Sequence, residues 1–304
     1  MKKGAIKFLN RFNFKDVKDK TILITGGNSG VGFESARYCL YLGMKVILCA
    51  RNIKRGEDAI NKLRIEFPSS SISLMIIDLS EEESIKKFAK EIIDKQIDID
   101  VFYHNAGVYR LPYQVKEGRE LVISTNYFGP YMLTCLLLDY LHSLNHEVKM
   151  VITSSVAASW AKNDINMLTP NEEVSRMTRY SNSKLLDAYL FKYLLDNDES
   201  NIKYYLVHPG VTWTGLFYKT YKSKIFIKMV NIFMKLYGNS LWKSALSICR
   251  VLDKNAKEGA FYGPRRFFSF KGYPKENKFL DKQYLCVDEV IKKSEELLGY
   301  KLIK

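Results

Sequence analysis

The stretch Thr21–Gly32, TILITGGNSGVG, joins a short apolar run to a glycine-rich turn and the start of a helix-like segment. Its apolar and β-branched first residues predict a buried strand. Gly26, Gly30 and Gly32 let the backbone turn tightly and approach a pyrophosphate, which would face the N–H groups of the following helix. Glycines also mark ordinary turns, but this position after a strand favours dinucleotide binding. The same turn contains the further candidate binding residues Asn28, Ser29 and Val31.

Outward from this turn, strand-like and helix-like segments alternate along the chain. Continuous apolar strands separated by helices predict a parallel sheet with helices on both faces. The fold class is therefore α/β, a single-domain Rossmann-type doubly wound sheet. No repeat or linker marks a boundary, so we expect one dinucleotide-binding domain over residues 1–304. The expected strands are 21–25, 46–49, 72–77, 100–104, 148–153 and 202–207, and the expected helices are 31–43, 54–66, 81–95, 117–142 and 178–197.

The composition fits one large globular core with a basic surface. Of the 304 residues 47% are hydrophobic, and the formal net charge is +14. Such a charge suggests acidic partners, but Lys and Arg are spread along the chain and no nucleic-acid-binding motif appears. We therefore expect surface lysines and no nucleic-acid partner. Five widely spaced cysteines without a CxxC pair predict free thiols, and the histidines predict no metal site.

Two segments lie outside the alternating pattern. Residues 1–20 form a basic N-terminal extension without the apolar core of a signal peptide, and no stretch of about 18 uncharged apolar residues predicts a membrane span. We expect the extension to pack on the domain of a cytoplasmic protein; peripheral membrane contact is the alternative. Residues 218–285 are aromatic and basic and are expected to form a substrate-covering lobe. Within them 218–252 is amphipathic, which favours a lid with packed helices over a membrane-facing surface.

A tyrosine and a lysine at helical spacing are the candidate proton-transfer groups. Tyr180 and Lys184 lie four residues apart on an expected helix and share a face. A free tyrosine has a pKa of about 10, and a nearby ammonium favours the phenolate. The phenol could then give a proton to an alkoxide or take one from an alcohol. Ser155 could hydrogen-bond the substrate oxygen, with Ser154 as its competitor. A Tyr–Lys pair alone is also common on exposed helices.

Further motifs follow in order, and together they resemble the short-chain dehydrogenase/reductase family, whose glycine motif is TGxxxGxG. The resemblance runs along most of the chain. It implies that Asn126 joins the catalytic set and that a carbonyl or alcohol is the substrate. The matching positions are Asp78 with Leu79 after the third strand, Asn105-Ala106-Gly107 after the fourth, Asn126, Ser155, the YxxxK pair Tyr180 and Lys184, and Pro209-Gly210 with Thr214 after the sixth strand.

The resemblance also assigns roles and a branch. It places Asp78 near the adenine and Thr214 near the nicotinamide carboxamide. It also implies that Tyr180 and Lys184 take part in catalysis and contact the cofactor. The long interval from Ser155 to Tyr180 and the HPG sequence at 208–210 are similar to the retinol-dehydrogenase-like branch. His104 departs from the asparagine that many members carry there. Dimers and tetramers are frequent in the family, so a homo-oligomer is a further expectation.

The end of the second strand predicts a preference for NADP(H), with NAD(H) as the alternative. An NAD site usually carries an acid about 20 residues past the glycine loop. Ala50-Arg51-Asn52 has none, and Arg51 offers a planar charged fork suited to phosphate. Lys54 and Arg55 add positive charge or simply begin a helix. Ser29 weakens this prediction, because many NADP-preferring relatives carry a basic residue there.

Aromatic residues near the expected site loops predict an apolar substrate pocket, with core packing as the alternative. The rival function is a non-catalytic dinucleotide-binding regulatory or scaffold protein, which need not keep all four catalytic residues. A sugar-nucleotide epimerase would show a GxxGxxG loop, which this chain lacks. The pocket candidates are Tyr109, Tyr113, Trp160, Trp213, Phe217 and Tyr218.

Overall fold

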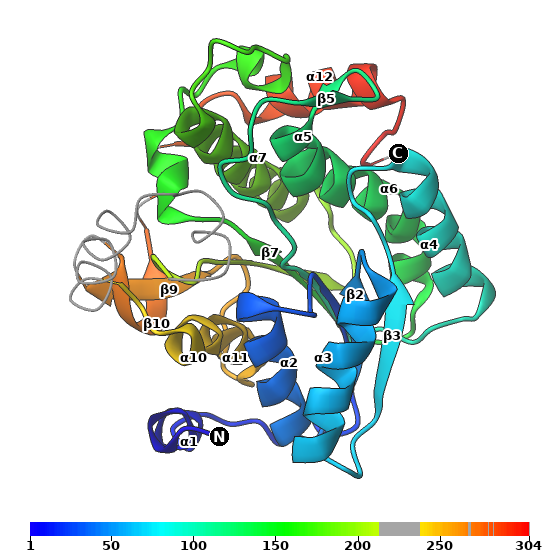
Figure 1. The fold of residues 1–304 in the computed structure, drawn as a ribbon, viewed down its shortest axis with the longest axis vertical. Helices are drawn as coiled ribbons and strands as arrows, with labels where there is room; N and C mark the ends of the chain where they lie inside the picture. The colour runs from blue at the N-terminus through cyan, green and yellow to red at the C-terminus, as the bar shows by residue number, and fades with distance from the viewer. Residues whose placement is uncertain (213–237, 267–268, 279, 282, 304) are drawn as a thin grey trace.

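The computed structural model describes residues 1–212, 238–266, 269–278, 280–281 and 283–303. Its main sheet contains β1 (Thr21–Thr25), β2 (Lys45–Ala50), β3 (Ile72–Ile76), β4 (Val101–His104), β7 (Val148–Thr153), β8 (Ile202–Val207), β9 (Phe261–Arg266) and β10 (Lys271–Asn277). The strand order is β10-β9-β8-β7-β4-β1-β2-β3 (Figure 1). Neighbours from β3 to β9 are parallel, and only the edge pair β9–β10 is antiparallel.

Helices cover both faces of this sheet, and each face has its own apolar core. Side chains alternate along the strands, so that Ile22 and Ile24 enter one core while Leu23 enters the other. This arrangement confirms the predicted doubly wound α/β fold (Figure 1). The helices that share the core with Ile22 are α1 (Lys3–Leu9), α2 (Gly30–Tyr41), α3 (Ile53–Glu66), α10 (Leu241–Ser244) and α11 (Leu246–Leu252); those that share the core with Leu23 are α4 (Glu82–Asp94), α5 (Leu121–Ile123), α6 (Gly129–Ser143), α7 (Arg176–Asn197) and α12 (Val287–Leu298).

The long helix expected over 117–142 begins later, at Leu121, and is interrupted. Before it, β5 (Val115–Lys116) and β6 (Arg119–Glu120) form a small hairpin. Its turn uses positive φ at Glu117 (52°) and Gly118 (74°), which a helix cannot contain. The residues Ser124–Phe128 then form a π-helical turn between α5 and α6. Such turns are frequent at functional sites because they redirect one side chain of a helix.

The combined stretch Leu121–Ser143 has the length and hydropathy of a membrane span, although the sequence analysis expected none. Length and composition are the whole of that evidence. Within the protein, 78% of its most apolar window is buried, and α6 packs against α4. This burial is that of a core helix in a globular domain.

The C-terminal third adds strands that the sequence analysis did not expect. β9 continues the parallel sheet beside β8, and β10 closes that edge. The basic N-terminal extension packs on the domain, as expected: Phe8 is buried and stacks on Tyr273 with ring centroids 5.0 Å apart. Most of the amphipathic segment 218–252 lies outside the described residues, so the substrate-covering role of 218–285 stays a prediction.

Candidate active site

The glycine-rich turn is closed against the end of β4. Gly26 has a φ of +65°, and a Cβ there would lie 2.9 Å from the Cα of Ala106. A Cβ on Gly32 would lie 2.4 Å from Nδ2 of Asn105. Only glycine fits these contacts, because any side chain would collide with the neighbouring backbone or amide. The turn leads directly into α2, whose first N–H groups remain available to an anion.

Thr25 joins this turn to the asparagine motif after β4. Its hydroxyl accepts hydrogen bonds from the backbone N–H groups of Asn105 and Ala106, both at 3.0 Å. The Asn105 amide in turn donates to the Thr25 carbonyl at 2.9 Å. Two predicted cofactor-binding segments are thus held together at the carboxyl edge of the sheet. The sequence analysis did not assign this role to Thr25, although it precedes the glycine motif directly.

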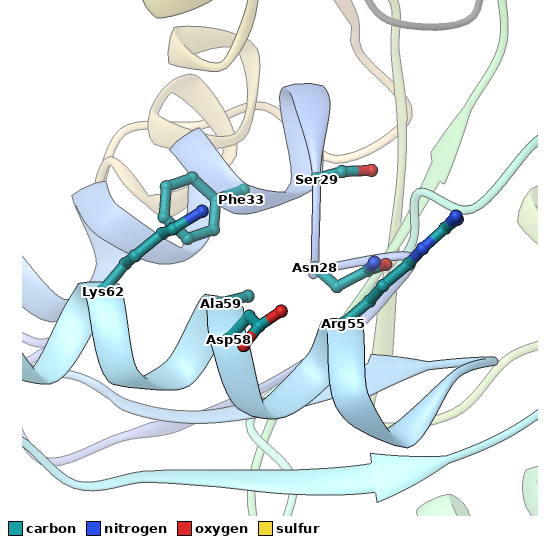
Figure 2. A pocket seen from close by; sticks show the side chains of 7 residues that line it. All are labelled: Asn28, Ser29, Phe33, Arg55, Asp58, Ala59 and Lys62. Carbon is teal, nitrogen blue, oxygen red and sulfur yellow. The ribbon is translucent and has the colours of Figure 1, made fainter.

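A pocket of about 510 Å³ lies between the glycine-rich turn and α3. Figure 2 shows the Arg55 side chain lying near Asn28 and the Lys62 side chain lying near Phe33. Two cations and one carboxylate, Asp58, face this space, which suits a phosphate-bearing ligand. Lys62 had no predicted role, because its position in the middle of a charged helix is typical of a solvated face. The lining residues are Asn28, Ser29, Phe33, Arg55, Asp58, Ala59 and Lys62.

Arg51 and Asp78 lie side by side at the ends of neighbouring strands. Nε of Arg51 is 3.7 Å from Oδ2 of Asp78, and the arginine side chain is 65% exposed. Asp78 is fixed from its other oxygen, which accepts from the N–H and hydroxyl of Ser80 at 2.9 and 2.7 Å. Leu79 is buried behind them, and its carbonyl packs against Gly129. Arg51 and Asp78, which were both predicted to contact the cofactor, therefore form an ion pair at the carboxyl edge of the sheet.

Asn126 lies in the π-helical turn and reaches two other elements. Its side-chain oxygen accepts from the N–H of Val108 at 2.7 Å, and its amide donates to Oγ of Ser183 at 2.9 Å. A Cβ on Gly107 would lie 3.4 Å from that oxygen and 3.5 Å from Nζ of Lys184. The predicted residues Gly107, Asn126 and Lys184 are thus brought together on the fold.

Lys184 is buried and held by two acceptors. Its ammonium donates to the Thr153 carbonyl at 3.0 Å and to Oδ2 of Asp187 at 2.7 Å. Burial lowers the pKa of Lys184, but the Asp187 carboxylate and the Tyr180 phenol outweigh this, so the net pKa is raised. These contacts therefore favour the protonated form of the lysine. Asp187 was not among the predicted residues.

The structure separates the roles of the two candidate serines. Ser154 is buried, and its hydroxyl donates to the Lys184 carbonyl at 2.6 Å. Ser155 is more exposed and caps the 3-10 turn Val156–Trp160, where its Oγ accepts from the Ala157 N–H at 3.2 Å. Because Ser155 accepts in this contact, its own proton can be donated to another oxygen. Ser154 is committed to the packing of α7, as its short bond indicates.

Tyr180 is half-buried and stands against an aromatic wall. The rings of Tyr109 and Tyr180 meet edge to face with centroids 4.7 Å apart. Trp160, also predicted for the pocket, is 54% exposed and meets Phe270 at 6.4 Å. Tyr113 lies instead beside the Arg179 guanidinium. The other aromatic candidates, Trp213, Phe217 and Tyr218, lie outside the described residues.

The turn after β8 is fixed by Asn239 and His208. Asn239 donates to the Pro209 carbonyl at 3.1 Å, and Gly210 takes a φ of +77°. Burial lowers the pKa of His208 to about 3, so its neutral ring accepts from the Gly210 N–H at 3.1 Å. This shape presents the turn at the same carboxyl edge of the sheet as the glycine loop. Thr214, predicted beside it, lies outside the described residues.

A buried ion pair that was not predicted from the sequence fixes the loop after β4 to α7, the helix that carries Tyr180 and Lys184. Nε of Arg179 lies 3.3 Å from Glu120, and the two side chains are 6% and 3% exposed. Glu120 also accepts from the N–H groups that begin α5, at 2.8 and 2.9 Å. Burial raises the pKa of Glu120, although the Arg179 guanidinium opposes this. Because Arg179 directly precedes Tyr180, the pair sets that part of α7 against the loop.

A Rossmann-type sheet with a glycine-closed first turn, and a tyrosine and a buried lysine on one helix at its carboxyl edge, define the class of nicotinamide-dinucleotide-binding proteins. The model of the short chain dehydrogenase family matches residues 20–224, more than half of the chain. The chain therefore belongs to the short-chain dehydrogenase/reductase family, whose members are oxidoreductases acting on CH–OH or C=O groups. The predicted family is confirmed.

Named relatives point in the same direction. The chain is 30% identical to short-chain dehydrogenase TIC 32 B of Brassica napus over 240 residues, which cover 75% of this chain and 73% of that protein. It is 31% identical to human retinol dehydrogenase 12 over 65% of this chain and 63% of that protein. Retinol dehydrogenases are thus among its relatives, as the sequence predicted.

Solved structures agree on the fold. L-sorbose reductase from Gluconobacter frateurii, complexed with NADPH and L-sorbose, matches with a TM-score of 0.65 and 16% identity over 80% of this chain and 93% of that one. Levodione reductase matches with a TM-score of 0.64 and 19% identity over 79% of this chain and 93% of that one. A nicotinamide dinucleotide is the cofactor of this family, and the bound neighbours carry its phosphorylated form.

Proposed function

We propose that this chain is an NADP(H)-dependent oxidoreductase that interconverts a hydrophobic aldehyde or ketone and its alcohol, with Tyr180 as the general acid and base. One observation carries this proposal. Lys184 is held as a buried cation one helical turn after Tyr180, with Asn126 and Gly107 beside it. A dinucleotide-binding scaffold has no need of a buried cation at that place, because burying a charge is costly.

The residues at the carboxyl edge fit a dinucleotide. The glycine-rich turn has no room for a Cβ, and with the N-terminus of α2 it suits a pyrophosphate. The pocket that Arg55 and Lys62 line suits a further phosphate. When bound, the cofactor supplies or accepts the hydride. The residues proposed to hold it are Gly26, Asn28, Ser29, Gly30, Val31, Gly32, Arg51, Asp78, Leu79, Asn105, Ala106, Gly107, Tyr180, Lys184, Pro209, Gly210 and Thr214.

The side chains of the protein would handle the proton and the substrate oxygen. Tyr180 gives its phenolic proton to the carbonyl oxygen in reduction and takes it back from the alcohol in oxidation. Ser155 donates a hydrogen bond to the same oxygen and stabilises charge there. Asn126 orders the polar groups near Lys184, whose ammonium favours the phenolate that remains after reduction.

The preference for NADP(H) is proposed from the charges around the pocket. Arg51 at the end of β2 and Arg55 and Lys62 on α3 place positive charge beside the glycine-rich turn. A 2′-phosphate would meet these cations. Of the described carboxylates beside them, Asp58 lines the pocket and Asp78 is paired with Arg51, where an NAD site usually grips the free ribose hydroxyls with an acid.

An apolar substrate is proposed from the tyrosine wall. Tyr109 meets Tyr180 edge to face, so an aromatic ring stands directly beside the proposed acid, with the Arg110 guanidinium 5.8 Å from the centroid of that ring. A cytoplasmic location, peripheral membrane contact and a homo-oligomer stay predictions.

The test is a panel of apolar aldehydes, ketones and alcohols, followed by nicotinamide absorbance with NADPH, NADH and their oxidised forms. We expect turnover with at least one apolar carbonyl and a higher kcat/KM for NADPH. The matched control is the Tyr180→Phe variant. Tight NADPH binding without turnover on the whole panel would favour the rival, a non-catalytic dinucleotide-binding protein.

A further inference from the structure

Asp187 places a buried carboxylate on the catalytic helix within hydrogen-bond distance of the active-site lysine. Its Oδ2 lies 2.7 Å from Nζ of Lys184, and the two side chains are 3% and 5% exposed. Pairs three residues apart on a helix are usually solvated and contribute little. This one is removed from water, so the two charges are strongly coupled and each controls the other.

Burial and the Lys184 ammonium are the two influences on the Asp187 carboxylate. Burial raises the pKa of the Asp187 carboxyl to about 6, although the Lys184 ammonium opposes the shift. From the π-helical turn, Tyr127 faces the same carboxylate; burial and then nearby negative groups, including Asp187 and Glu295 of α12, raise the pKa of this phenol. The Tyr127 hydroxyl is bonded to Ser294 at 2.8 Å, and a phenol brings no positive charge that could compete with Lys184 for Asp187.

The same lysine also acts on Tyr180. A lone ammonium beside a phenol favours the phenolate, which is the base needed to oxidise an alcohol. A carboxylate bonded to that ammonium reduces its field, since the pair together carries no net charge. The phenol then keeps its proton to higher pH, and a protonated phenol is the acid needed to reduce a carbonyl.

We propose that Asp187 is a positioning residue that fixes the Lys184 ammonium against Thr153 and balances its charge, so that the ammonium draws the Tyr180 phenol less strongly toward the phenolate and the site is suited to carbonyl reduction. This inference rests on the proposed oxidoreductase function. In the step concerned, the reduced dinucleotide would supply hydride from its nicotinamide to the carbonyl carbon and be oxidised. The phenolic proton of Tyr180 moves to the oxygen, and the phenolate left behind takes a proton from solvent.

The experiment compares Asp187→Asn with Asp187→Glu and with Asp196→Asn. Asp196 lies on the same helix in an exposed pair with Lys192, so its variant controls for the loss of one carboxylate. The ionisation of Tyr180 is read without any substrate or cofactor, as the tyrosinate absorbance that each protein loses on the added change Tyr180→Phe. The kcat/KM for alcohol oxidation is followed against pH in parallel.

In Asp187→Asn we expect the Tyr180 titration and the acidic limb of the oxidation profile to move to lower pH by about one unit. A loss of activity at alkaline pH should accompany this, because the unpaired buried lysine gives up its proton more easily. Asp187→Glu, which keeps the charge, and Asp196→Asn should both retain the wild-type midpoint. An unchanged midpoint in Asp187→Asn, or an equal shift in Asp187→Glu, would overturn the proposal.

The two readouts separate this inference from the function beneath it. The wild type could turn over no carbonyl or alcohol while the Tyr180 midpoint of Asp187→Asn still differs from that of the wild type. In that case the charge balance stands and the proposed function fails. If turnover is present and the midpoint does not move, the function stands and Asp187 has only a structural role. Reduced thermal stability of Asp187→Asn without a shift in midpoint counts against the proposal in the same way.

Discussion

The charges around Tyr180 are buried and paired, whereas the charges around the glycine-rich turn lie at the surface. Lys184 and Asp187 are 5% and 3% exposed, but Arg51 is 65% exposed. A buried charge needs a partner fixed within the fold, since the loss of hydration is otherwise uncompensated. An exposed charge keeps much of its hydration, so Arg51, although 3.7 Å from Asp78, is still accessible to the phosphate of a ligand.

This difference predicts which property of the protein a substitution at each end will alter. At the catalytic end, a substitution alters groups that also hold α7 in place, so chemistry and stability are linked there. At the exposed charged residues of the cofactor end, a substitution changes the electrostatic field met by a ligand and leaves the packed core unchanged. The predictions below use this contrast, from the largest expected effect to the smallest.

The largest effect is expected from Tyr180→Phe, which keeps the ring and removes the hydroxyl. Turnover should fall by at least about a hundredfold, the usual scale for a general acid. Binding of NADPH, followed by fluorescence titration, should weaken far less than turnover, because the cations proposed to bind its phosphates lie on α3 and at the end of β2. Near-normal turnover would refute the role of Tyr180. A loss of NADPH affinity as large as the loss of turnover would show that the catalytic end and the cofactor end are not independent.

The buried pair of Arg179 and Glu120 should act on stability. Arg179→Met leaves Glu120 buried without its guanidinium, and the free energy of unfolding should fall by about 3 kcal/mol. Urea unfolding measures this. The control is Arg11→Met, where the arginine is exposed near the N-terminus and a change well below 1 kcal/mol, roughly 0.5 at most, is expected. Similar unfolding curves for the two variants would show that burial does not distinguish these charges.

The sequence did not predict which charged residues are buried and paired, although it predicted much of the fold. The strands over 148–153 and 202–207 have the predicted bounds, because continuous apolar runs flanked by polar turns mark buried parallel strands. β9 and β10 escaped prediction because Gly263, Pro264, Gly272 and Pro274 interrupt them, and these residues normally indicate turns. β10 is the edge strand and tolerates such residues because it makes fewer ladder bonds, whereas β9 pairs with β8 through Phe261 and Tyr262, ahead of its glycine and proline.

For the site, ordered motifs predicted which residues meet at the carboxyl edge but not how their charges are paired. A Lys and an Asp three residues apart on a helix read as a solvated pair, so Asp187 gave no distinct signal. Glu120 and Arg179 are far apart in sequence, and a contact of that kind depends on the path of the chain between them. Burial, which decides the strength of both pairs, is a property of the whole fold.

At the exposed end, Arg51→Asp should change cofactor choice. The wild type should favour NADPH over NADH in kcat/KM, and the variant should lose about tenfold of that ratio through repulsion of the 2′-phosphate. Its core should be intact, so thermal unfolding should stay near that of the wild type. The control is Lys45→Asp, an exposed change of equal charge at the opposite end of β2. An unchanged ratio in Arg51→Asp would remove it as the phosphate reader.

The smallest effect is expected from salt, and it acts on the two ends differently. Raising the ionic strength from about 0.05 to about 0.5 M shortens the screening length to less than half, which weakens exposed charges far more than buried ones. The KM for NADPH should therefore rise by about threefold, and the KM for NADH, which lacks the 2′-phosphate, should rise less. The kcat at saturating cofactor should stay constant, because Lys184 and Asp187 are shielded from ions by the fold. If kcat falls with salt while both KM values hold, the charges that matter for turnover are exposed, and the contrast between the two ends is wrong.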